Sequence, residues 1–351
     1  MNDTQQILRE MVERLFADHV NPPLLAQAEQ GIWPGALWRL VEQQGLTRPR
    51  VPEEQGGLGC GWDDAFIIVR AAGYHGLPIP LPETIAASWL LSQAGLTSPD
   101  GPLTLGGAHP EDRLRLAPGN QGWRLSGTAH RVPWGRAAGS VVLVLGETGN
   151  LRIAHAACAG AKIEPGTNLA GEPRDRLSFT DHPVAVAPWP AAFADNPVRT
   201  IGAMLRSAQI AGALANALDR SITYANDRYQ FGRPIAKQQA VQHDLARLAA
   251  EAAAVEVAAE TAFLAAERGD PDLLVAAAKI HAGLAVPQAT GIAHQVHGAI
   301  GFTLEHPLQW ATRRLMSWRN EFGGDRQWSV ILGRRILDLG ADRFWPYLAA
   351  Q

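Results

Sequence analysis

A stripe of small and branched apolar residues constrains the fold of this chain more than any other feature. Such residues recur at steps of four and three along one stretch: Val241, Leu245, Leu248, Ala252, Val255, Ala259 and Ala262. This spacing places them on one face of an α-helix of about 30 residues, which would be about 45 Å long. Because the small side chains allow neighbouring helices to approach closely, the stripe predicts a helical bundle.

The size and charge of the chain exclude several classes of protein. At 351 residues it exceeds a single core of about 100–200 residues, so we expect two or three packed units. With 46% apolar and 19% charged residues the chain is not a disordered polyelectrolyte. A net charge of −3 predicts no general nucleic-acid or anionic membrane surface.

Targeting features are weak in this sequence. The aliphatic run VVLVL at 141–145 is far shorter than the roughly 20 residues that span a bilayer, so we expect no membrane insertion. Residues 1–16 lack the basic head and apolar block of a signal peptide. The two cysteines show no metal or redox spacing, which fits a reducing compartment. We therefore expect a cytoplasmic protein.

The pattern of residue types, and with it the expected secondary structure, changes twice along the chain. Residues 1–103 are typical of helices with turn breaks, and residues 104–195 contain short alternating or β-branched segments separated by Gly, Asn and Pro. Residues 196–351 are strongly helical again. We therefore predict an α+β fold, mostly α, with an N-terminal helical domain, a small antiparallel β domain and a C-terminal four-helix bundle.

The segment RYQFGRPIAKQQAVQ, at 228–242, forms the corner between two long helices of the predicted bundle. Arg228 ends one helix, Gly232 permits a left-handed backbone and Pro234 prevents simple continuation. Taken alone, Arg228 has two interpretations. It is either a cation that interacts favourably with the C-terminal end of the helix dipole, with Phe231 as a core plug (a side chain that fills the core), or a binding residue.

The segment YANDRYQFGRPIAKQQAVQHDLARLA, which contains this corner, and QVHGAIGFTLEHPL at 295–308 resemble the two C-terminal signatures of the acyl-CoA dehydrogenase family. P-x-x-x-G-G-x-G at 52–59 and W-x-L-x-G at 123–127 match the same family. The resemblance implies FAD bound in extended form between the β domain and the bundle, partly across a subunit interface. It also implies a reaction that introduces an α,β double bond into an acyl-CoA thioester.

The resemblance implies contacts to FAD along the corner. Arg228 would meet the pyrophosphate, because a guanidinium stays charged and matches phosphate oxygens as a fork. Gln230 would donate to the same region, and Phe231 would line the nucleotide. Gln238 or Gln239 would lie near the adenine end.

The second signature implies a further set of FAD contacts. Gln295 and Gly298 would approach the diphosphate of a flavin that is bound mainly by a neighbouring subunit. Where the family motif commonly has a second glycine, this chain has Ala299.

The catalytic base is the main departure from the family pattern. The reaction needs a carboxylate held in an apolar pocket, which raises its pKa toward neutrality. The common family position matches Phe322, and the alternative position, on the first bundle helix, matches Gly202. Glu321, one residue early, is our candidate base, with a solvated loop glutamate as the alternative. Glu305 matches a non-catalytic family glutamate.

A second departure concerns the β domain. Residues 103–122 contain no good copy of the Thr/Ser- and Gly-rich loop that covers flavin and substrate in relatives. Arg131, Val132 and Pro133 stand where many relatives have Trp-Ile-Thr against the flavin ring, and proline has no amide to donate.

These departures resemble the smaller subunits of heteromeric acyl-CoA dehydrogenases, such as those that act on steroid side chains. Two functions therefore remain open: a self-sufficient dehydrogenase, or a catalytically incomplete flavin-binding or structural subunit. The resemblance also implies an acyl-CoA substrate, an electron-transfer flavoprotein as electron acceptor, and a homo-tetramer or hetero-tetramer.

We expect neither a metal site nor a nucleic-acid surface. His294 and His297 lie three residues apart on a predicted helix but lack a third ligand at a familiar spacing. Arg313, Arg314 and Arg319 are too few to form a basic face.

Overall fold

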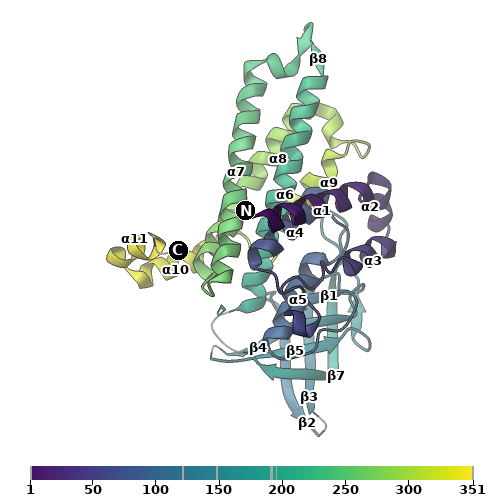
Figure 1. The fold of residues 1–351 in the computed structure, drawn as a ribbon, viewed down its shortest axis with the longest axis vertical. Helices are drawn as coiled ribbons and strands as arrows, with labels where there is room; N and C mark the ends of the chain where they lie inside the picture. Colours follow the sequence, from purple (N-terminus) through teal and green to yellow (C-terminus); the bar gives the residue numbers. More distant parts are fainter. Residues whose placement is uncertain (1, 121, 148, 190–192, 195, 350–351) are drawn as a thin grey trace.

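The computed structural model describes residues 2–349 except 121, 148, 190–192 and 195. N-terminal helices, a central sheet and C-terminal helices follow one another along the chain (Figure 1). The predicted mostly helical α+β fold is therefore confirmed. The N-terminal helices lie beside the long helices of the bundle, and the sheet lies below both in this view.

The N-terminal part consists of five α-helices and one short 3₁₀ turn among the described residues: α1 (Asp3–His19), α2 (Pro22–Glu29), α3 (Gly35–Gln43), η1 (Glu53–Gln55), α4 (Trp62–His75) and α5 (Leu81–Gln93). α4 packs on α6 of the bundle at two glycines. A side chain at Gly73 would overlap the backbone of Gln209, and one at Gly212 would overlap the carbonyl of Arg70. The two helices can approach this closely only without those side chains, and one apolar core extends across both.

The middle part is a seven-stranded sheet built from β1 (Leu103–Gly106), β2 (Arg113–Gly119), β3 (Gly122–Pro133), β4 (Ser140–Glu147), β5 (Asn150–Ala157), β6 (Lys162–Glu164) and β7 (Arg174–Pro188). The strand order is β1-β4-β5-β7-β3-β2, with β6 on β7. The pairs are antiparallel, as predicted, except that β1 runs parallel to β4. β4 carries the predicted aliphatic run, and Val141, Val142 and Leu143 within it are fully buried.

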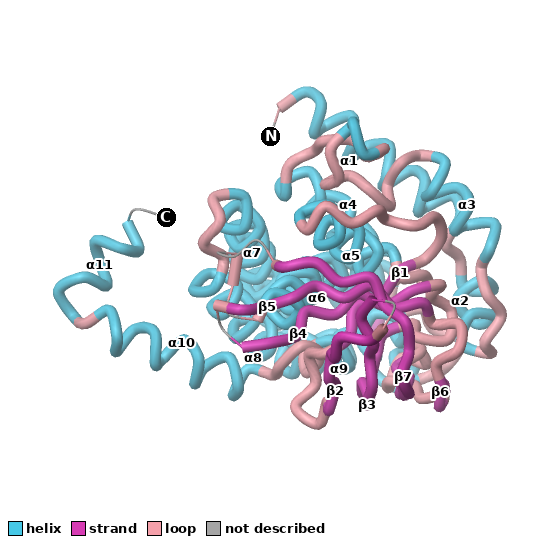
Figure 2. Tube along the Cα trace, turned by 90° about the horizontal axis from the view of Figure 1, so that it is seen from below, coloured by secondary structure: helices cyan, strands magenta, loops and turns pink. Residues whose placement is uncertain are grey.

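The C-terminal part is helical: α6 (Pro197–Asp227), η2 (Ile235–Lys237), α7 (Gln239–Glu267), α8 (Asp272–His297), η3 (Gly298–Phe302), α9 (Leu308–Trp318), α10 (Asp325–Leu339) and α11 (Ala341–Ala349). A two-residue-per-strand hairpin, β8 (Tyr229–Gln230) and β9 (Arg233–Pro234), joins α6 to η2 and α7. α6, α7 and α8 pack on one another, and α10 packs on α8. α11 projects from one side of the bundle (Figure 2), packs on α10, and is tied to the α7–α8 connection by a hydrogen bond from the hydroxyl of Tyr347 to Asp270 at 2.6 Å.

The predicted apolar stripe lies in α7. Its members from Leu248 to Ala262 are buried, whereas Val241 and Leu245 are only partly buried. The stripe was therefore a reliable signal for a long helix that packs against others.

α8 is the most apolar helix of the bundle. Among the described residues, only the segment 272–302 is long and apolar enough to cross a bilayer, and 61% of its most apolar window is buried inside the protein. A core helix of a globular protein meets the same criteria. α8 ends at Gly298, whose φ of 63° is left-handed.

Candidate functional site

A cavity of about 920 Å³ lies between the sheet and the bundle. Its walls come from the end of β1 with the β1–β2 loop (105–110), the end of β3 (130–133), Arg174 at the start of β7, the start of α6, and the α9–α10 connection (320–323) with α10. Segments far apart in the sequence therefore meet here. They include 131–133 and 321–322, two of the stretches at which this chain departs from the family pattern.

Glu321 lies at the inner wall of this cavity, and two arginines hold its carboxylate. Arg174 donates from Nε to Oε1 at 2.7 Å, and Arg206 donates from Nε to Oε2 at 2.7 Å. Asn168 donates to Oε1 at 3.0 Å. Although burial acts to raise the pKa of Glu321, the charges of Arg174 and Arg206 lower it to about 2.

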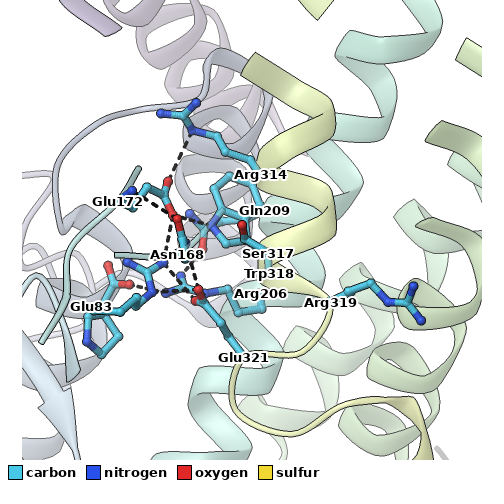
Figure 3. A network of polar contacts seen from close by, with 12 residues as sticks. Glu83, Asn168, Glu172, Arg206, Gln209, Arg314, Ser317, Trp318, Arg319 and Glu321 are labelled. Carbon is cyan, nitrogen blue, oxygen red and sulfur yellow. Dashed lines mark hydrogen bonds and ion pairs between the residues drawn. The ribbon is translucent and has the colours of Figure 1, made fainter. Parts of the chain in front are cut away.

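The network extends from Arg206 toward the N-terminal helices. Its Nη2 donates to Glu83 of α5 at 2.5 Å, and its Nη1 makes a short contact with Gln209 (Figure 3). The side chains of Arg206 and Glu83 are only 1% and 2% exposed. Each charge is therefore paired away from water, which is the condition for a buried ion to be tolerated.

The network extends from Arg174 toward α9. Arg174 donates to Glu172 at 2.8 Å, and the indole Nε1 of Trp318 donates to the same carboxylate at 2.9 Å. Arg314 lies 3.3 Å from the other oxygen of Glu172. Arg319 is drawn beside the network but points away from it (Figure 3). The N-terminal helices, the β domain and the bundle are thus joined by one set of buried ion pairs.

This environment does not suit the base role predicted for Glu321. A general base for this chemistry needs a pKa near the working pH, whereas a carboxylate with a pKa of about 2 has little tendency to take up a proton. The alternative prediction, a solvated loop glutamate, is wrong because the side chain is only 8% exposed. The geometry is that of a structural ion-pair centre.

Phe322 and Gly202 are the two positions at which the family pattern would place a base, and they face each other. A side-chain carbon at Gly202 would overlap the ring of Phe322. The guanidinium of Arg206 lies 5.4 Å from the centre of the same ring, in a cation–π contact. An aromatic ring therefore occupies the place at which the family pattern predicts a carboxylate.

The loop that carries Phe322 is held tightly. Phe322 has a φ of 54°, an unfavourable left-handed value for a non-glycine residue. The buried Lys279 donates from Nζ to the carbonyls of Arg319 and Gly323, at 2.6 and 2.8 Å. Burial lowers the pKa of Lys279 to about 7. The indole of Trp328 donates to the carbonyl of Phe322 at 3.0 Å. The side chains of Lys279 and Trp328 therefore hold the loop backbone in its strained conformation.

The segment 131–133 lines the same cavity from the β domain. Val132 and Pro133 are buried, whereas Arg131 is exposed with a φ of 51°. The carbonyl of Pro133 accepts a short hydrogen bond from the hydroxyl of Thr104. The fold therefore brings these residues to Phe322 and Glu321, but Pro133 offers no amide to a ligand.

The predicted cofactor contacts of the corner lie elsewhere. Arg228, Gln230 and Phe231 are exposed on the hairpin, which Figure 1 shows at the end of α6 far from the sheet. Phe231 is 93% exposed, so it is not a core plug. α6 has 31 residues, so about 45 Å separate Arg228 from the cavity residue Arg199 at the other end.

Gln238 and Gln239 mark the start of α7 beside this hairpin. Gln238 precedes the helix in an extended conformation, and its amide donates to the carbonyl of Ile235 at 2.9 Å. The side chain of Gln239 is exposed. Both glutamines therefore belong to the exposed end of the bundle.

Gln295 and Gly298 line a second hollow, of about 720 Å³. Apart from its neighbours along the chain, no atom of the described residues lies within 4 Å of the place where a side chain at Gly298 would begin, so this stretch of backbone is open. Beside it, Phe302 is 72% exposed and stacks on His294 at 4.3 Å. In the described part of the chain, the residues that line this hollow all differ from those that line the cavity. Within one chain, the predicted site residues thus lie at three separate places.

Sequence reasoning missed the ion pairs that Glu321 and Glu172 make with buried arginines. Arg206 carried one usable signal, since it is a charge inside a long, largely apolar helical stretch, and such a charge needs a partner. Glu83, Glu172 and Arg174 carried none, because only the fold brings them to Arg206 and Glu321.

Comparisons with known proteins agree with this architecture. Residues 2–97 match the family model for the acyl-CoA dehydrogenase N-terminal domain, and residues 200–336 match the model for the C-terminal domain. The acyl-CoA dehydrogenase IpdE2 of Mycobacterium tuberculosis is 31% identical over 310 residues, which are 87% of this chain and 89% of the relative. The chain belongs to the acyl-CoA dehydrogenase family, whose members are oxidoreductases that act on acyl-CoA.

A longer relative and two solved structures are also similar. The acyl-CoA dehydrogenase FadE34 of Mycobacterium tuberculosis is 31% identical over 296 residues, which are 81% of this chain but 40% of FadE34. The crystal structure of the ChsE4-ChsE5 complex from Mycobacterium tuberculosis matches with a TM-score of 0.88 and 21% identity, over 97% of this chain and 99% of that one. The Tcur3481-Tcur3483 steroid ACAD G363A variant matches with a TM-score of 0.85 and 24% identity, over 96% and 98%. These two structures share the fold.

Proposed function

We propose that this chain is one subunit of a heteromeric, FAD-dependent acyl-CoA dehydrogenase that introduces an α,β double bond into an acyl-CoA thioester. A larger homologous subunit supplies the catalytic base. The observation that carries this proposal is the contact between Phe322 and Gly202, which leaves no carboxylate at either family base position.

The chemistry needs a residue that removes the proton next to the thioester carbonyl. Glu321 is near, but Arg174 and Arg206 hold it ionised and fully engaged. Releasing it toward a substrate would leave two buried guanidinium groups without their partner, which is strongly unfavourable. The residues that this chain contributes are therefore suited to shaping the cavity and to excluding water from it. They are not suited to moving a proton.

The residues that would hold FAD fit a shared site. FAD supplies the hydride acceptor of the family reaction when it is bound. Arg228 presents an exposed guanidinium that can donate a fork of hydrogen bonds to a pyrophosphate, and Gln230 lies beside it. A flavin ring in the chain's own cavity and a pyrophosphate at Arg228 would need a cofactor about 45 Å long. The hairpin therefore serves a flavin held mainly by another subunit.

The lengths and neighbours of the relatives support two-subunit assembly. FadE34 is about twice as long as this chain, so it has room for a second unit of similar size. The ChsE4-ChsE5 complex, named for two different subunits, contains a chain with this fold. We propose a hetero-tetramer in the cytoplasm that acts on a steroid or fatty acyl-CoA and passes electrons to an electron-transfer flavoprotein.

A self-sufficient dehydrogenase with Glu321 as its base is the second candidate. One observation favours it: Glu321 lines the cavity together with the segment 131–133. This function would require that substrate binding separates Glu321 from Arg174 and Arg206.

The test compares the chain alone with the assembled complex. The purified protein is examined for its visible spectrum and then offered acyl-CoA thioesters with an artificial electron acceptor. We expect colourless or inert protein that gains flavin and turnover when a larger homologous subunit is co-expressed. Yellow protein that is bleached by substrate without a partner would overturn the proposal and support the second candidate.

A further inference from the structure

Two histidines and a glutamate meet at the rim of the cavity. His109 and Glu111 lie in the β1–β2 loop, and His130 lies on β3. One possible ligand atom from each lies within 4.8 Å of the other two. Both histidines are half-buried and line the cavity, whereas Glu111 is exposed.

Asp112 supports this cluster from behind. Its carboxylate accepts from the backbone amides of His109, at 2.9 Å, and His130, at 2.6 Å. The same carboxylate lies 3.3 Å from Nδ1 of His130. A carboxylate at Nδ1 favours the tautomer with the proton on that nitrogen. The lone pair of Nε2 is then available to bind a metal, which is the usual arrangement behind metal-bound histidines.

We propose that His109, Glu111 and His130 bind one divalent transition-metal ion of the zinc type. Two imidazoles and one carboxylate are ligands that Zn²⁺ accepts, and three protein ligands leave a fourth position open. This proposal is independent of the function proposed above, because it needs neither flavin nor a partner subunit.

The surroundings allow a cation despite nearby arginines. Arg113 turns its guanidinium to the carbonyls of Pro110 and Asp112, at 3.1 and 2.8 Å. Glu111 and Asp112 contribute two negative charges beside the histidines. Nδ1 of His109 faces the amide of Glu111 at 3.3 Å, a weak contact that a metal bond at this atom would replace.

The site escaped prediction because only the fold forms it. His109 and His130 lie on different segments, and their spacing matches no metal motif. A bound ion would fasten the β1–β2 loop to β3 at the cavity rim. The open position could then hold an anionic group of a ligand in the cavity.

Metal binding can be tested on the full chain without a histidine tag. After chelator treatment and dialysis, Co²⁺ is titrated as a probe by its visible absorption, and Zn²⁺ by calorimetry. We expect one ion per chain, and competition between the two metals. Absence of stoichiometric binding of either metal would overturn the proposal.

Variants separate this site from other histidines. Glu111→Gln changes an exposed side chain, so the fold should be unaffected, and we expect at least tenfold weaker binding. Asp112→Asn should weaken binding about 10–100-fold. His130→Ala should abolish it, with circular dichroism to check folding. The matched control is His243→Ala, an exposed histidine on α7, which should bind as the wild type does. Unchanged affinity in Glu111→Gln and His130→Ala would also overturn the proposal.

Discussion

The two ends of α6 use arginine in opposite ways. In its first third, Arg206 is 1% exposed and pairs with Glu83 and Glu321 inside the protein. At its end, Arg228 is exposed on a hairpin, and its side chain has no protein partner within the described part of the chain. A paired, buried arginine stabilises one arrangement of the N-terminal helices, the sheet and the bundle, whereas an unpaired, exposed one is available to a ligand. The comparison indicates that the cavity end of α6 holds the fold together, whereas the hairpin end is the place at which we propose that FAD binds.

The largest expected effect concerns the buried end. Arg206→Met should lower the free energy of unfolding by about 3–5 kcal/mol, because it leaves the carboxylates of Glu83 and Glu321 buried without this partner. Chemical denaturation measures it. The control is Arg334→Met, on the exposed face of α10, which should change stability by less than about 0.5 kcal/mol. Equal effects of the two substitutions would contradict the difference between buried and exposed arginines.

Acid should remove nearly as much stability. The pKa of Glu321 is lowered to about 2 in the folded protein, so its carboxylate stabilises the fold fully above its ordinary value of 4.5. That contribution, about 3 kcal/mol, is lost as the pH falls from 4.5 toward 2. The difference in unfolding free energy between wild type and Glu321→Gln should shrink accordingly over this window. A difference that does not vary with pH would show that Glu321 is not held by its arginines.

The third effect tests the exposed end. In the assembled complex, Arg228→Ala should weaken FAD binding about tenfold to a hundredfold, since a charge-assisted hydrogen bond contributes about 1.5–3 kcal/mol. Flavin release is measured by fluorescence, and thermal stability of the chain alone should not change. Arg233→Ala, on the same hairpin, is the matched control. If both substitutions weaken FAD equally, the hairpin contributes only general positive charge.

The smallest expected effect sharpens the role of Glu321. Glu321→Gln should change the turnover of the assembled, folded complex by less than about twofold, measured at low temperature because the variant is less stable. Loss of a general base instead reduces turnover about 10²–10⁴-fold. A loss of that size with flavin retained would restore Glu321 as the base.

The sequence predicted the features that depend on local pattern. The periodic stripe of α7 and the alternating strands depend on residues that are close together in the sequence. The fold class could therefore be predicted from them. The positions matched to family bases, Gly202 and Phe322, do lie together in the fold. The predicted contacts to FAD remain predictions, because they depend on a second subunit.

Long-range pairing could not be predicted from the same patterns. The fold alone brings Glu83, Arg174 and Arg206 to Glu321, and no periodicity reports such a meeting. The prediction for Glu321 therefore depended on its place in a loop, and the two alternatives were a catalytic base and a solvated side chain. The parallel pairing of β1 with β4 was missed for the same reason, since partners in a sheet are chosen by tertiary packing.

The close fit of Phe322 against Gly202 restricts the routes by which this cavity can be redesigned. Any larger residue introduced at 202 first collides with the ring, so a glutamate there requires that position 322 be made small beforehand. Glutamate at 322, in turn, would meet the guanidinium of Arg206 where the ring now lies. The order of substitutions therefore matters, and the two positions behave as one unit in any stepwise path toward a working base.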